Sequence, residues 1–324
     1  MRIAALDIGT NTVLLLVADI DAGGTIHPVR HLQRFPRLGK DVDRNGSIHP
    51  EAFERLVAVI DEYAAVARTL NAERIVACAT SALRDAANRE DLLAYVKSKT
   101  GIMPEVLSGA DEALLTFRGG LSGLAGAGGM AAVIDVGGGS TEISYGMERA
   151  SRGEDLYRVS FQLGSVRLTE RFFRHDPPAR DELRSAGELI GEECSKFGAV
   201  GPADALLVGV AGTATTLACL DQGLMEFDVG KVRGYVLSRE RIGRWQERLS
   251  RLTTGEIRAL SAATEGRADI LTAGVLILHG FMERLGWEAL TVSERGLRYG
   301  IILREWEGAP GTRPAGEPPV REGP

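Results

Sequence analysis

The sequence predicts an α/β protein of two domains with a ligand cleft between them. Strand-like and helix-like hydrophobic patterns alternate along its 324 residues, and a hydrophobic content of 44% is enough for two cores. A motif centred on Asp7 returns at Asp135, so the second half restarts the pattern of the first. Residues 119–129 hold six glycines in eleven positions, which places the domain hinge there.

These observations divide the chain into a first domain of residues 1–124 and a second of residues 125–306. In the last eighteen residues, 307–324, nine are glycine or proline. That composition cannot bury enough apolar surface to order a chain, so the segment is expected to be a disordered tail.

In the first half, apolar runs at 4–8 and 13–18 predict two strands of a hairpin. Apolar residues from Phe53 to Ala67 recur with the spacing of one helix face. A short buried strand over 75–79, a helix over 91–99 and a strand over 104–107 follow.

The second half begins with another hairpin, with apolar runs at 132–136 and 143–145, and continues with a buried strand that precedes a loop starting at Val208. Helix-spaced apolar residues predict helices over 183–197, 242–252 and 270–285. Ser238 is the expected N-cap of the middle one.

Both hairpin turns have a composition suited to binding phosphate. Asp7-Ile8-Gly9-Thr10-Asn11 and 135–142 (Asp-Val-Gly-Gly-Gly-Ser-Thr-Glu) combine glycines with hydroxyl donors. Glycine lets successive N–H groups point toward an anion, while Asp would repel phosphate and is better suited to hold Mg²⁺, through water, against the phosphate oxygens. The alternative is that Asp-x-Gly only closes a hairpin, but two copies heading two halves of one chain favour phosphate.

A third loop of this kind covers residues 208–216, Val-Gly-Val-Ala-Gly-Thr-Ala-Thr-Thr, after a buried strand and at the start of a helix. Three such loops predict a phosphate-rich ligand between the domains. The net charge of −6 argues against non-specific nucleic-acid binding. A polyanionic ligand would therefore need a local basic strip, whose candidates are His31, Arg34, Arg37, Lys40, Arg84, Arg167, Arg171, Arg233, Arg267, Arg295 and Arg298.

Other features narrow the class of protein. The three cysteines are scattered without metal or redox spacing, which is typical of buried thiols in a reducing cytosol. No signal peptide or membrane span is predicted, so we expect a cytoplasmic protein that does not bind membranes. The five histidines show no ligand spacing and are assigned no chemistry.

The loops resemble those of the actin-like phosphotransferase superfamily, and a set of segments in order resembles the exopolyphosphatase and guanosine pentaphosphate phosphatase (Ppx/GppA) family. The set spans residues 3–303, nearly the whole chain. Its segments are 7–11 (DIGTN), 37–39 (RLG), 79–86 (ATSALRDA), 108–113 (SGADEA), 135–142 (DVGGGSTE), 164–170 (GSVRLTE), 212–216 (GTATT) and 293–300 (SERGLRYG).

The resemblance implies two actin-like, ribonuclease H-like domains and hydrolysis of the terminal phosphoanhydride of inorganic polyphosphate, with Mg²⁺ as cofactor. Guanosine pentaphosphate is the alternative substrate, and the chain resembles the short, two-domain members. An ATP-dependent kinase or an actin-like nucleotide switch are alternatives of another class. We also expect a homodimer that does not bind nucleic acid.

The same resemblance, with the loop chemistry, supplies the expected site residues. Asp7, Asp135 and Glu142 are expected at the metal. Phosphate contacts are expected from Gly9, Thr10, Asn11, Arg37, Ser81, Arg84, Gly137, Gly138, Gly139, Ser140, Thr141, Gly212 and Thr213.

The segment 108–112 indicates which carboxylate activates water. Ser108 followed by Asp111 is the pattern of a capping box, in which Asp111 folds back to the backbone. Glu112 is then free to point into the cleft, and the family resemblance makes it the expected catalytic base. The alternative for Glu112 is a favourable interaction with the helix dipole.

Three positions depart from the family pattern. Leu14 stands where many members carry Arg, His or Lys, Leu83 stands where a hydroxyl is common, and Arg233 stands where His is frequent. These departures leave the choice of substrate open but not the reaction type.

Overall fold

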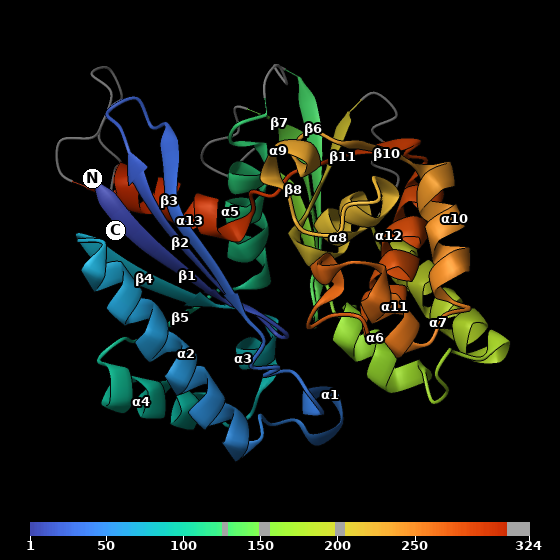
Figure 1. Cartoon of the computed structure of the whole chain (residues 1–324), viewed down its shortest axis with the longest axis horizontal. Coiled ribbons are helices and arrows are strands. Elements are labelled where there is room, and N and C mark those ends of the chain that lie inside the picture. The colour runs from blue at the N-terminus through green and yellow to red at the C-terminus, as the bar shows by residue number, and fades with distance from the viewer. Residues whose placement is uncertain (125–128, 149–155, 198–204, 310–324) are drawn as a thin grey trace.

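The computed structural model describes residues 1–124, 129–148, 156–197 and 205–309. Two mixed β-sheets lie side by side, with helices α5 (Gly109–Leu121) and α13 (Leu297–Glu307) between them (Figure 1). The predicted α/β class with two domains is confirmed. Of the predicted hinge, 119–129, residues 119–121 belong to α5 and residues 125–128 lie outside the described residues. Most of the predicted tail, 307–324, also lies outside them, although Glu307 still belongs to α13.

The first sheet has five strands in the order β3-β2-β1-β4-β5. Strands β1, β2 and β3 are antiparallel, whereas β1, β4 and β5 are parallel. The strands are β1 (Arg2–Ile8), β2 (Val13–Ile20), β3 (Ile26–Arg34), β4 (Arg74–Ala79) and β5 (Glu105–Val106). The accompanying helices are α1 (Val42–Asn45), α2 (Pro50–Thr69), α3 (Ser81–Asp85) and α4 (Arg89–Thr100).

Strands β1 and β2 are buried on both faces, which explains their continuous apolar runs. One face packs on α2 and α4 through side chains such as Leu56, Ile60 and Val96. The other face carries Ile3, Ala5 and Leu16. The sheet is therefore fixed from both sides, and the β1–β2 turn is held at its edge.

The second sheet has six strands in the order β10-β11-β9-β6-β7-β8. Its strands are β6 (Met130–Val136), β7 (Thr141–Met147), β8 (Tyr157–Phe161), β9 (Leu206–Val210), β10 (Val236–Ser238) and β11 (Ala289–Val292). Its helices are α6 (Ser165–Phe172), α7 (Arg180–Ser195), α8 (Ala211–Asp221), α9 (Val229–Val232), α10 (Arg239–Leu249), α11 (Thr254–Leu260) and α12 (Leu271–Leu285), with a short 3₁₀ helix at Ala262–Thr264. The predicted N-cap is confirmed, since Ser238 accepts a hydrogen bond from the Arg241 N–H.

The two hairpins occupy equivalent places in the two sheets. In the first, Asp7 pairs with Leu14 of the antiparallel neighbour and with Cys78 of the parallel neighbour β4. In the second, Asp135 pairs with Glu142 and with Val210 of β9. The duplication read from the sequence is thus a duplication in space. It also brings the polar segments after β4 and β9 beside the hairpin turns.

Helix α13 returns to the first sheet, although the expected boundary at 124/125 counts it with the second domain. Its Leu297, Tyr299 and Ile302 join the core on the free face of β1 and β2. It also packs closely on α5, because a Cβ at Gly119 would lie 2.0 Å from the Gly296 carbonyl oxygen. The chain therefore passes between the domains twice, through α5 and α13.

Two class predictions can be compared directly with the structure. The three cysteines are free and buried. Within the described ranges, no helix combines the length and the apolar character that crossing a membrane requires.

Candidate active site

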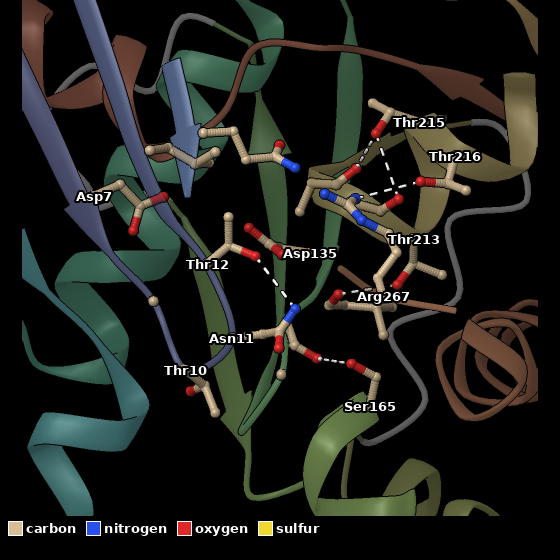
Figure 2. Close-up of a pocket in the computed structure, with 18 of the residues that line it drawn as sticks. Asp7, Thr10, Asn11, Thr12, Asp135, Ser165, Thr213, Thr215, Thr216 and Arg267 are labelled. Carbon is tan, nitrogen blue, oxygen red and sulfur yellow. Dashed lines mark hydrogen bonds between the residues drawn. The ribbon is translucent and has the colours of Figure 1, made fainter. Parts of the chain in front are cut away.

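A cavity of about 470 Å³ lies between the domains. Both hairpin turns line it, together with the start of α8 and residues of the 262–271 and 294–298 segments. Figure 2 shows Asp7 and Asn11 of the first hairpin across the cavity from Asp135, Thr213 and Arg267. The two domains thus contribute to one site.

The first phosphate-type turn is closed by a hydrogen bond from the Gly9 N–H to the Thr12 carbonyl, at 2.9 Å. The following loop wraps this turn, since the Gly39 N–H donates to the Thr10 carbonyl at 2.7 Å. A Cβ at Gly39 would lie 2.0 Å from the Thr10 methyl, so only glycine fits. This close contact explains why a glycine lies in the 37–39 segment.

The second turn is built in the same way, with the Gly137 N–H donating to the Ser140 carbonyl at 3.0 Å. It touches the first domain, because a Cβ at Gly139 would lie 2.5 Å from the Ser81 hydroxyl oxygen. The Ser165 hydroxyl, at the start of α6, donates to the Gly137 carbonyl at 3.1 Å (Figure 2). Glycine is therefore needed where the backbone of one domain meets side chains of the other.

Two aspartates face the cavity from equivalent strand ends. Burial raises the pKa of Asp7 to about 7, with Arg298 acting in the opposite direction. Burial, then repulsion from Glu112 and Asp7, raises the pKa of Asp135 to about 8. The raised pKa values mean that nearby positive charge does not offset the cost of burying these two carboxylates in their ionised form. A cation bound beside them would offset that cost.

Glu112 also lines the cavity, from the first turn of α5, and is 7% exposed. Burial raises its pKa, while the guanidinium of Arg84, with Nη1 2.7 Å from Oε2, lowers it. The neighbouring Asp111 is exposed and accepts a hydrogen bond from the Ser108 hydroxyl at 2.6 Å. Ser108 caps α5 as predicted, accepting from the Asp111 N–H. The Asp111 carboxylate, however, is seen bound to the hydroxyl rather than to the backbone.

Glu142 lies beside Asp135 in the sheet but is not among the residues that line the cavity. The Ser160 hydroxyl donates to its Oε1 at 2.6 Å. Its pKa is raised well above the ordinary value, by burial first and then by Glu112 and Asp135. Glu142 therefore acts on the electrostatics of the site as the cross-strand neighbour of Asp135.

The third loop places Gly212 and Thr213 in the cavity at the start of α8. Gly212 makes room for Arg267, since a Cβ there would lie 1.9 Å from the Arg267 Nη1. Arg267 donates to the Thr216 hydroxyl at 3.3 Å, and its buried Nε has no partner in the described structure. Burial lowers its pKa to about 10, so this cation has its charge poorly compensated inside the cavity.

Arg298 is a second cation lining the cavity, next to Asp7. It donates to the Leu15 carbonyl at 3.4 Å and contacts the His31 ring. Burial lowers its pKa, and Asp7 opposes that shift. In the described part of the chain, neither Arg267 nor Arg298 forms an ion pair with a carboxylate.

Most of the residues that the sequence assigned to the site line this cavity. They are Asp7, Gly9, Thr10, Asn11, Ser81, Glu112, Asp135, Gly137, Gly138, Gly139, Ser140, Gly212 and Thr213.

Arg37, Arg84 and Thr141 were also assigned to phosphate, but none of them lines the cavity. Arg37 binds Asp269 across the cleft, with Nη1 2.7 Å from Oδ2. The Thr141 hydroxyl donates to the Leu163 carbonyl at 2.6 Å. Arg84 binds Glu112, as described above, so direct contact of these three with phosphate stays a prediction.

The sequence did not single out Arg267 and Arg298 from the other candidates of the basic strip. Arg298 lies in the 293–300 segment, which was a usable signal. Arg267 lies outside all of the segments and could be found only through its contact with Gly212. The sequence also gave no sign of the apolar side of the cavity, formed by Phe35, Phe227, Val229, Ile270 and Leu271.

The donor set fits Mg²⁺ in one particular way. Among the described residues, no three His, Cys, Asp or Glu side chains come close enough together to hold a metal ion by themselves. Mg²⁺ usually keeps several waters and is held by one or two carboxylates and the phosphates of its substrate. Asp7 and Asp135, facing the cavity from two domains with raised pKa values, suit that arrangement.

Comparison with known proteins agrees with this geometry. Residues 16–308 match the Ppx/GppA phosphatase family. Exopolyphosphatase 2 of Mycobacterium tuberculosis is 36% identical over 316 residues, covering 93% of this chain and 98% of that protein.

Two solved structures extend the comparison to the fold. The Ppx/GppA family member of Aquifex aeolicus is 32% identical with a TM-score of 0.78, covering 94% of this chain and 97% of its own. An exopolyphosphatase from Cytophaga hutchinsonii is 28% identical with a TM-score of 0.86, covering 95% and 99%. The expected two-domain actin-like fold is therefore confirmed.

Proposed function

Because the chain belongs to the Ppx/GppA phosphatase family, we propose that it is an exopolyphosphatase that releases orthophosphate from the end of inorganic polyphosphate. The observation that carries the proposal is the position of Glu112. Its carboxylate lines a cavity whose other walls are glycine and hydroxyl loops suited to phosphate. Hydrolysis needs a base beside the bound phosphate that can accept a proton from the attacking water, and water is then the only nucleophile required.

In the proposed reaction, water attacks the terminal phosphorus. The bond from that phosphorus to the bridging oxygen breaks, and the chain leaves one phosphate shorter. Glu112 accepts the proton of the attacking water. The backbone N–H groups of the two turns, with Arg267 and Arg298, hold the phosphate oxygens and stabilise the charge that builds up on them.

We propose that Mg²⁺ is the cofactor and that Asp7 and Asp135 hold it, through water, against the substrate. The ion would neutralise charge on the phosphate oxygens. Glu142 would support this pair through its place beside Asp135 in the sheet.

Guanosine pentaphosphate is the second candidate substrate, and one feature of the cavity favours it. Phe227, Val229 and Leu271 form an apolar wall of the cavity. Inorganic polyphosphate has no apolar group that could pack against it. Phe227 is 48% exposed, so its ring is available to an incoming planar group. A nucleoside would bury this apolar surface while its phosphates occupied the turns.

The proposal is tested by measuring orthophosphate release from long polyphosphate, short polyphosphate and guanosine pentaphosphate side by side, without ATP or an acceptor. Release from polyphosphate at the highest kcat/KM supports it. Release from guanosine pentaphosphate alone supports the second candidate. A requirement for ADP or another acceptor would instead indicate a kinase. A cytoplasmic location and a homodimer stay predictions.

A further inference from the structure

The ion pair between Arg84 and Glu112 joins two parts of the first domain at the edge of the cavity. Arg84, on α3, places Nη1 2.7 Å from Oε2 of Glu112 and 3.1 Å from the Leu107 carbonyl. The side chains of Arg84 and Glu112 are 17% and 10% exposed. The Arg84 guanidinium is thus held from two directions, by the Glu112 carboxylate and by the carbonyl of Leu107, the residue before the N-cap of α5.

The pair divides the two oxygens of Glu112. Oε2 is occupied by Arg84, whereas no hydrogen bond from the described residues reaches Oε1. Glu112 lines the cavity and Arg84 does not. Arg84 is therefore placed to act on the base, and its contact decides which oxygen remains available to water.

We propose that Arg84 is a positioning residue that orients the Glu112 carboxylate so that Oε1 takes the proton of the attacking water. This inference rests on the proposed function, because it takes Glu112 as the base. It differs from the expectation that Arg84 binds phosphate directly, which would make Arg84 a determinant of KM rather than of kcat.

Charge gives Arg84 a second effect on the same group. The ionisable groups that act on Glu112 from the neighbouring elements are carboxylates: Asp7 on β1, Asp85 on α3, Asp135 on β6 and Glu142 on β7. Repulsion between two ionised carboxylates is mutual, so each of them, when ionised, disfavours the ionised form of Glu112. Arg84 is the cation that touches it, so removing Arg84 raises the pKa of Glu112 further.

Four variants test the inference. Arg84→Gln removes the charge, and Arg84→Lys keeps the charge without the planar fork. Arg304→Gln is the matched control, because Arg304 and Glu105 form a pair of the same 2.7 Å length that lies away from the cavity. Glu112→Gln supplies the background in which Arg84 has no base to position.

The expected result for Arg84→Gln is a kcat lower by roughly 10², the effect of a misplaced catalytic group, with KM changed by less than about twofold. The acid limb of its kcat–pH profile moves to higher pH. Arg84→Lys loses kcat but keeps the acid limb near its wild-type position. Arg304→Gln changes neither.

The double variant separates the possible failures. If Arg84 acts through Glu112, Arg84→Gln lowers kcat no further in the Glu112→Gln background, even if it also lowers the melting temperature. An additive loss, or a tenfold rise in KM with kcat and the acid limb unchanged, overturns the inference while leaving the proposed function intact. Wild-type kcat in Glu112→Gln alone overturns the proposed base itself.

Discussion

The arginines around the cleft fall into two groups that the sequence does not distinguish. Arg37 and Arg167 bind carboxylates across the domain boundary, on Asp269 and on Asp43. Arg267 and Arg298 line the cavity and have no carboxylate partner in the described structure. A cation already neutralised by the protein holds the domains together, whereas one left without an anion is available to the substrate.

The same contrast separates two adjacent carboxylates. Asp111 is exposed and bound by its own helix cap, while Glu112 faces the cavity. Position relative to the cavity, rather than residue type, divides structural from chemical roles in both cases.

The largest effect is expected for Glu112→Gln. The amide keeps the shape of the side chain but cannot accept the proton of water, so kcat should fall by roughly 10² to 10⁴. Steady-state kinetics measures the loss of turnover, and a direct binding assay with polyphosphate measures substrate affinity. Binding should persist. Asp111→Asn is the control and should leave kcat nearly intact. Reversed effects of the two substitutions would contradict the contrast.

The next largest effect is expected for Arg267→Ala. A charge-assisted hydrogen bond is worth about 1.5–3 kcal/mol, so KM for polyphosphate should rise roughly 10- to 150-fold. Arg37→Ala, which removes an arginine already bound to Asp269, should change KM by less than about twofold. The distinction between paired and unpaired arginines fails if the two variants exchange these results.

The aspartates of the cavity predict a pH-dependent stability for the metal-free protein. Folding raises the pKa of Asp7 to about 7 and of Asp135 to about 8, from about 3.9 in the unfolded chain. The folded state therefore binds more protons, and its stability should fall as pH rises from about 4 through 8.

Thermal melts with and without Mg²⁺ measure this effect. The melting temperature of the metal-free protein should drop by several degrees between pH 5 and pH 8. Adding Mg²⁺ should raise the melting temperature more at pH 8 than at pH 5. Asp135→Asn should flatten the profile. An equal effect of Mg²⁺ at both pH values would speak against metal binding by these carboxylates.

The smallest effect is expected for Asp269→Asn, which breaks the pair with Arg37. Both side chains are about a third or more exposed, so screening limits the loss to about 0.2–1 kcal/mol in the free energy of unfolding. Urea unfolding at low and high salt measures it, and the difference from wild type should shrink at high salt. A lower KM in this variant would show that Asp269 competes with substrate for Arg37.

The sequence predicted the parts of the site that are local in the chain. The Asp-x-Gly turns and the loop at 208–216 are continuous segments. Their glycines and hydroxyl side chains are enough to indicate phosphate binding. The pattern of Ser108 and Asp111, three residues apart, left Glu112 free to point into the cleft, and the family resemblance then made Glu112 the expected base.

The contacts that were not predicted join distant segments. Arg84 and Glu112 are 28 residues apart and lie in two different motifs, each of which suggested its own role. Helix α13 returns to the first sheet because that sheet leaves an apolar face open, and this need is not visible in the helix itself. Arg267 becomes a site residue only through the space that Gly212 leaves for it.

The central claim is that water is the acceptor and that Glu112 activates it. Turnover of polyphosphate in oxygen-18 water, with no nucleotide present, tests this most directly. The account predicts that each orthophosphate released by the wild-type protein carries one solvent oxygen, and that Glu112→Gln forms it far more slowly. Orthophosphate without solvent oxygen, or transfer of the phosphate only when ADP is added, would contradict it.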